Sequence, residues 1–191
     1  MAARWFISAF ETRHTTDPWY TIIELIIIHI AIEHLMKLNI DIDENHLKEG
    51  GILLNTLLAD EFVLYTKTRS AHWNIQGQNF IELHTFFENQ SGTLDNIIDD
   101  VAERVRALGH VALGSLKDFI SVSRLNENNH DFTDQHHLIQ SLLEDHEALI
   151  RSLRKDITNT AEHRDLGSAD FMTGLLEQHE KMSWMLRAHL M

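Results

Sequence analysis

The segment from Asn79 to Gly109 constrains the fold of this chain most, because it reads as one uninterrupted amphipathic helix. Asn79 is a favourable N-cap residue, and Glu82 stands where it can close a capping box. Gly109 suits the left-handed position that follows a helix C-terminus. At about 100° per residue, one face of this helix is apolar and predicts a buried stripe. That stripe comprises Phe80, Leu83, Phe87, Leu94, Ile98, Val101 and Val105.

An adjacent stripe on the same helix, about 100° wide, carries side chains that bind metal ions: His84, Glu88, Asp99 and Glu103. Each pair, His84 with Glu88 and Asp99 with Glu103, spans one turn. About 22 Å of helix separates His84 from Asp99, so the two pairs cannot share a metal ion within one chain. Two copies of the helix packed antiparallel about a two-fold axis would bring one chain's histidine-containing pair against the other chain's acidic pair. Such an interface makes two equivalent sites.

These residues and their spacing resemble the Dps family of mini-ferritins, the DNA-binding proteins from starved cells. The matching elements are the HWN tripeptide that begins at His72, then His84, Glu88, Asp99 and Glu103, at intervals of 12, 4, 11 and 4 residues. The resemblance covers roughly residues 36–191. It implies a four-helix ferritin-like subunit, a hollow homododecamer built from two-fold dimers, and ferroxidase sites between subunits. Such sites oxidise Fe(II), usually with hydrogen peroxide, and the ferric product is stored inside the shell.

The resemblance also implies a role for each of the five residues. His72 of one chain joins Asp99 and Glu103 of the partner subunit at the tighter iron position, where Glu103 bridges the two ions. His84 and Glu88 serve the second, weaker position. Iron favours carboxylate oxygens together with imidazole nitrogens and needs open positions for the oxidant. Many family members carry Asp where this chain has Glu88, so the added methylene alters the geometry of the second position but not its charge.

The remainder of the chain predicts three more long helices, at about 46–73, 133–160 and 169–188, and a short helix at 115–122. Only 8 glycines and 1 proline occur in 191 residues, which favours long uninterrupted helices. Four long helices with a mid-chain crossover are typical of a ferritin-like bundle. We therefore predict an all-α fold, a ferritin-like four-helix bundle with a short extra helix between the second and third long helices.

Residues 1–35 differ in character from the remainder and predict a separate N-terminal extension, with the Dps-like domain at 36–191. Residues 19–35 are strongly apolar, but charged and polar residues leave no uncharged run of the roughly 18–20 residues that a spanning helix needs. The segment also lacks the pattern of a secretory signal peptide. We therefore expect no membrane association, and our hypothesis is that natural translation starts at Met36.

The amino-acid composition limits the kinds of site and partner that the chain can have. With no cysteine, the chain holds no disulfide, thiolate zinc site or iron–sulfur cluster, which is compatible with the cytoplasm, where we expect the protein. The net charge is −13, from 16 basic and 29 acidic residues. That charge disfavours general electrostatic binding of nucleic acid. It fits an acidic shell that draws in cations, and equally an acidic surface that only confers solubility.

Standard ferritins build a di-iron centre inside the bundle from Glu residues and Glu-x-x-His motifs on long helices. Here that motif occurs only at Glu11–His14 and Glu127–His130, outside the predicted long helices, so an intra-bundle centre is disfavoured. Adjacent residues diverge on a helix, so three adjacent histidine–glutamate pairs predict surface positions. These pairs are His146–Glu147, Glu162–His163 and His179–Glu180.

Three functions stay open at this point. The leading one is a ferroxidase that uses hydrogen peroxide or dioxygen and stores iron, protecting the cell from oxidative stress. The second is a nucleoid-associated protein that protects DNA physically, with iron in a secondary role. The third is a cage whose metal site holds zinc or stays empty. The first two differ in DNA binding, which family members often achieve with a mobile Lys/Arg-rich tail.

We expect weak DNA binding or none. The segment 36–49 holds only Lys37 and Lys48 against four acidic residues, and so few cations retain a duplex poorly at physiological salt. A gel shift at about 0.15 M salt should show no stable complex. Tight retention that weakens as salt rises would contradict this prediction.

Overall fold

The computed structural model describes residues 22–23, 25–26, 38–127 and 134–191. The chain divides into two units, Met1–Asn39 and Ile40–Met191. Most of the predicted extension at 1–35, the Glu11–His14 motif and the histidine of the Glu127–His130 motif lie outside the described residues. Within the described part of the chain, no helix is both long enough and apolar enough to cross a membrane.

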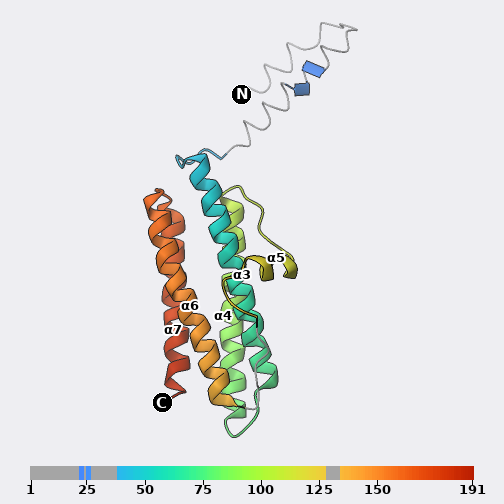
Figure 1. Cartoon of the computed structure of the whole chain (residues 1–191), viewed down its shortest axis with the longest axis vertical. Helices are drawn as coiled ribbons and strands as arrows, with labels where there is room; N and C mark the ends of the chain where they lie inside the picture. Colours follow the sequence, from blue (N-terminus) through green and yellow to red (C-terminus); the bar gives the residue numbers. More distant parts are fainter. Residues whose placement is uncertain (1–21, 24, 27–37, 128–133) are drawn as a thin grey trace, which may run out of the picture. The chain divides into compact units, whose positions relative to one another are not determined.

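Among the described residues, the second unit contains four long helices and one short helix, in the predicted order (Figure 1). They are α3 (Glu44–Asn74), α4 (Phe80–Ala107), α5 (Leu116–Val122), α6 (Gln135–Glu162) and α7 (Leu166–Ala188). The predicted bounds of the long helices agree with these to within three residues, because the apolar periodicity and the turn residues that produced them are local signals. The short extra helix lies between the second and third long helices, as predicted.

The helices form two antiparallel pairs, α3 with α4 and α6 with α7, and a long crossover joins them (Figure 1). After α4, His110 packs against Gly51 and donates from Nε2 to the Leu47 carbonyl at 2.7 Å, so α4 ends beside the start of α3. The Gln135 side chain donates to the Gln76 carbonyl, so α6 begins beside the end of α3. The crossover therefore runs the length of the bundle, and α4 and α6 run parallel.

α4 begins and ends where the sequence predicts, but its N-cap differs from the prediction in one detail. Gly109 follows the C-cap with φ +81°, the left-handed conformation that glycine tolerates. Asn79 is the N-cap residue, but its side chain makes no capping hydrogen bond. Its backbone (φ −98°, ψ 26°) is not in the extended conformation from which a cap side chain normally folds back.

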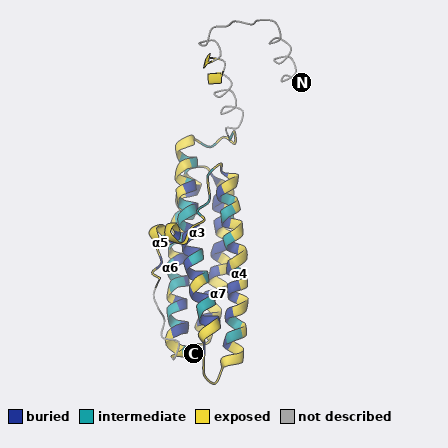
Figure 2. Ribbon diagram, turned by 90° about the vertical axis from the view of Figure 1, so that its right-hand side faces the viewer, coloured by how far each residue is buried: buried dark blue, intermediate teal, exposed yellow. Residues whose placement is uncertain are grey.

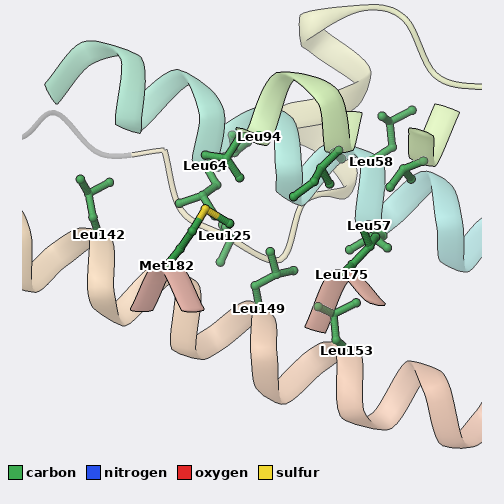
Figure 3. Close-up of a cluster of buried hydrophobic side chains, with 14 of the residues drawn as sticks. Leu57, Leu58, Leu64, Leu94, Leu125, Leu142, Leu149, Leu153, Leu175 and Met182 are labelled. Atoms are coloured by element: carbon green, nitrogen blue, oxygen red, sulfur yellow. The ribbon is translucent and has the colours of Figure 1, made fainter. Parts of the chain in front are cut away.

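Each long helix has a buried face (Figure 2), and buried leucines fill the space between the two helix pairs (Figure 3). Figure 3 shows leucines of α3, α6 and α7 meeting at the centre, together with Met182 and with Leu125 of the crossover. Most of the stripe predicted on α4 is buried, but two of its members are not. Phe80 is 38% exposed at the open end of the helix, and Ile98 is only partly buried, while Ile97 points inward in its place.

Asp60 of α3 anchors the crossover to the bundle and is fully buried. Its carboxylate accepts hydrogen bonds from the Arg124 backbone nitrogen at 2.6 Å, from Arg124 Nε at 2.7 Å and from Ser123 Oγ at 2.9 Å. Arg124 also pairs with Asp156 of α6 at 2.8 Å. Burial alone would lower the pKa of the Arg124 guanidinium, but these two carboxylates raise it, so the ion pairs stay charged.

Three polar side chains, connected in a row, cross the apolar core. His179 of α7 donates from Nε2 to Glu61 Oε1 of α3 at 2.9 Å, and its Nδ1 lies 3.0 Å from Nδ1 of His146 on α6. All three residues are fully buried, so the surface prediction was wrong for His146 and His179. Burial, and then the charge of His179, lowers the pKa of His146 well below 6.5, so His146 is neutral.

This depressed pKa predicts a loss of stability in mild acid. Below about pH 6.5 the unfolded chain binds a proton at His146 that the folded chain cannot accommodate. The free energy of unfolding should therefore fall as the pH drops from about 6.5 towards 5, by up to about 1.4 kcal/mol per pH unit more in the wild type than in His146→Leu. Denaturant unfolding of metal-free protein measures this slope. His137→Leu, at an exposed position on α6, should keep the wild-type slope, and equal slopes in wild type and His146→Leu would refute the assignment.

Candidate metal centre

His72 and His84 lie together at the end of the α3–α4 hairpin. His72 is in the last turn of α3, and His84 is one turn into α4. Their rings stack with centroids 3.9 Å apart and planes 24° apart. His72 Nδ1 lies 2.8 Å from the His84 backbone carbonyl, and His84 Nδ1 lies 2.8 Å from the His72 carbonyl. Because a carbonyl only accepts, both Nδ1 atoms carry a proton, and in the neutral form of each ring Nε2 has the lone pair that can bind a metal ion.

The turn between the two helices sets this register. Gly77 has φ +113°, and a Cβ at this position would meet the Gln135 amide at 2.6 Å. The turn therefore requires glycine for its backbone conformation, whereas the Gln135 amide is the end of a flexible side chain that can move aside. The α3 side of the turn is fixed by the Ile75 backbone nitrogen, which donates to the Ala71 carbonyl at 2.9 Å. His72 is 6% exposed in this frame, so its ring has little freedom to turn away.

The three carboxylates predicted as iron ligands, Glu88, Asp99 and Glu103, lie exposed on α4. None of them forms an ion pair or a side-chain hydrogen bond with another described residue. The neighbouring cation Arg104 is occupied elsewhere, at 3.1 Å from Asp165 and 2.9 Å from Ser168. The carboxylates thus present uncompensated negative charge on an open helix face, which attracts cations.

The structure brings some of the five predicted residues together and keeps others apart. His72, His84 and, one turn further along, Glu88 gather near the start of α4, and we call them the histidine half-site. Asp99 and Glu103, the acidic half-site, follow on the same unbroken helix. At 1.5 Å per residue the gap between His84 and Asp99 is about 22 Å. A single chain therefore holds both half-sites but does not join them.

Sequence reasoning missed a second convergence of metal-binding side chains. His46 and Glu49 of α3 meet His163, the residue that follows α6, and one ligand atom of each lies within 4.8 Å of the other two. His46 and Glu49 are three residues apart and share a helix face, which is the only local signal. His163 comes from far along the chain, and its predicted surface position is correct only in part, because its side chain is 27% exposed.

Comparison with known proteins agrees with this fold. A ferritin-like domain family matches residues 52–191. A DNA protection during starvation protein of Agrobacterium fabrum is 35% identical over 138 residues, covering 72% of this chain and 85% of the relative. The chain belongs to the Dps family. An uncharacterized low temperature-induced protein of Nostoc sp. is also similar, with 39% identity over 156 residues, 81% of this chain and 87% of that protein.

A solved Dps structure shows the same fold. The Dps protein of Vibrio cholerae has a TM-score of 0.74 and 29% identity, and the match covers 81% of this chain and all of that chain. That protein is described as a member of a broad superfamily of ferritin-like diiron-carboxylate proteins. The predicted ferritin-like all-α bundle is therefore confirmed. Membership of the Dps family supports an iron-binding, iron-storing role of the mini-ferritin kind.

Proposed function

We propose that this protein is a ferroxidase that oxidises Fe(II) at sites between two-fold-related chains and stores the ferric product. The observation that carries the proposal is the reciprocal pair of hydrogen bonds between His72 and His84. Each ring's Nδ1–H is bound to the other residue's carbonyl, so both Nε2 lone pairs are preset for metal. Metal-binding histidines usually donate their second ring nitrogen in this way, which fixes the ring and its tautomer.

In the proposed interface, the histidine half-site of one chain meets the acidic half-site of the partner subunit. His72 with Asp99 and Glu103 of the partner subunit forms the tighter position, and His84 with Glu88 forms the second. Two ferrous ions bring four positive charges, and the three carboxylates offset three of them. A hydroxide or oxide between the ions offsets more as the iron becomes ferric. All three carboxylates are exposed on the single chain, which supports this arrangement, because interface residues are exposed before two chains assemble.

The reaction balances with hydrogen peroxide as oxidant. Each of two ferrous ions gives one electron, the O–O bond breaks, and water supplies the remaining oxygen of the ferric oxyhydroxide while protons are released. Dioxygen is the alternative oxidant. The protein's part is to hold two ions side by side, so that both electrons reach one peroxide. Stepwise one-electron chemistry, which would release hydroxyl radical, is thereby avoided, and this is how the site would protect the cell from oxidative stress.

The storage part of the proposal requires a closed shell, which we propose to be a homododecamer of two-fold dimers in the cytoplasm. The net charge of −13 per chain supports cation uptake into such a shell. The name of the Agrobacterium fabrum relative makes DNA protection a second candidate. The acidic segment 36–49 argues against direct DNA contact, so protection by removing iron and peroxide fits this chain better.

The double variant His72→Ala with Glu103→Ala should lose rapid ferrous oxidation while the assembly stays intact. It removes one ligand from each half-site. Because loss of a group that only supports a metal ligand costs about 10–100-fold in activity, loss of two ligands should slow oxidation by at least about 100-fold. Stopped-flow absorbance after mixing Fe(II) and peroxide measures the rate, and light scattering measures the particle mass.

The matched control is His137→Ala with Glu144→Ala, which removes the same residue types from exposed positions on α6. It should oxidise iron at the wild-type rate. Unchanged kinetics in the His72, Glu103 variant would reject the proposed site. Metal analysis after aerobic ferrous loading separates the third possibility, because a zinc-filled or empty cage would retain no ferric iron.

A further inference from the structure

A group of metal-binding side chains lies at the opposite end of α3 from the histidine half-site. His46 and Glu49 occupy the first turns of α3, and His163 follows α6. The rings of His46 and His163 stack with centroids 4.0 Å apart and planes 8° apart. Glu49 Oε2 lies 3.5 Å from His163 Nδ1. We call these three residues the His46 cluster.

We propose that the His46 cluster binds one divalent transition-metal ion of the Zn²⁺ class, independently of the iron site between subunits. Two imidazole nitrogens and one carboxylate oxygen are a donor set that zinc uses in proteins, with a fourth position left for water. The same donors suit other first-row divalent ions, and selectivity then depends on geometry. All three ligands come from one chain, so this site needs no partner subunit.

The structure leaves room for an ion at this place. A cavity of about 20 Å³ is lined by the His46 cluster together with Gly50, Asn159 and other residues of α3 and α6. A volume of this size holds about one water molecule, and therefore one ion replacing it. The lining residue Asp165 does not compete as a ligand, because its carboxylate binds Arg104 and Ser168.

The backbone holds the two halves of the cluster in fixed positions. Arg164, next to His163, takes the left-handed conformation (φ +64°), and the turn is closed by the Asp165 nitrogen donating to the Thr160 carbonyl at 3.2 Å. Asp165 in turn caps α7 through Ser168. His163 therefore sits on a braced turn at the C-terminal end of α6, where the helix dipole favours a cation. The Arg164 guanidinium forms an ion pair with the Asp41 carboxylate at 3.9 Å, and not with Glu49.

To coordinate an ion, the cluster needs only rotation of its side chains. Zinc lies about 2.0–2.2 Å from its nitrogen and oxygen ligands, so ligand atoms now up to 4.8 Å apart must close by an ångström or more. Stacked rings direct their lone pairs along parallel planes, so one ring must turn about its Cβ–Cγ bond. The side chains of Glu49 and His163 are 59% and 27% exposed, which leaves space for this movement.

The test begins from a reference variant, His72→Ala with His84→Ala, Asp99→Ala and Glu103→Ala, which lacks ligands of both proposed iron positions. Calorimetric titration of the metal-free reference with Zn²⁺ should show one ion bound per chain. Adding His46→Ala and His163→Ala should abolish this binding. Adding His136→Ala and His137→Ala instead, which removes two exposed histidines at the start of α6, should leave it unchanged. Particle mass and helix content must match among the variants.

Glu49→Gln in the reference variant keeps the proposal testable if the two-histidine variant folds poorly, since Glu49 is exposed. It should weaken Zn²⁺ binding and shift the visible absorption of bound Co²⁺, which reports directly on the ligands. The proposal is overturned if the reference binds no Zn²⁺, if the His46, His163 variant binds it as well as the reference, or if the His136, His137 control loses it. None of these outcomes bears on iron oxidation, which is measured separately in otherwise wild-type protein.

Discussion

The unbroken course of α4 is the constraint on which the proposed chemistry depends. A straight helix from Phe80 to Ala107 cannot bring its two half-sites together, whatever its side chains do. The acidic face stays open to solvent in the single chain, and the histidine half-site presents Nε2 lone pairs without the carboxylates that would complete it. In the proposed dimer, two-fold symmetry joins the half-sites without further residues, because one antiparallel contact between two chains completes two sites. In the proposed scheme, iron oxidation is a property of the assembly, because a single chain does not complete either iron position.

Polar contacts in the interior hold α3, the crossover and α6 together. Burying a charge without a partner is expensive, and two buried charged residues of α3, Asp60 and Lys67, are paired with side chains of other elements. Asp60 binds Arg124 of the crossover, and Lys67 of α3 pairs with Asp145 of α6 while donating to the Asn126 carbonyl. These pairs connect α3 to α6 through the crossover. They fix the crossover along the bundle, beside α3 and α6.

The sequence predicted the fold well and the buried polar chain badly, and one physical reason explains both outcomes. Helix bounds follow from local periodicity, which is why Leu142, Leu149 and Leu153 were correctly placed inside. His146 lies between Leu142 and Leu149 in that same stripe, and His179 lies between Leu175 and Met182. Their positions indicated burial. The surface prediction failed because it considered how adjacent residues diverge, and not which of the two diverging residues falls on the apolar face.

Contacts between helices distant in sequence could not be predicted in the same way. The meeting of His46 and Glu49 with His163 depends on the relative register of α3 and α6, which the crossover and the core packing set together. The same register separates two kinds of metal site along α3, because His46 and His72 are about 39 Å apart on one helix. The His46 cluster has all its ligands in one chain, whereas in the proposed interface the histidine half-site is completed by Asp99 and Glu103 of the partner subunit. In the two proposals taken together, a transition metal can bind the His46 cluster in a newly folded chain, whereas the iron positions are complete only after two chains assemble.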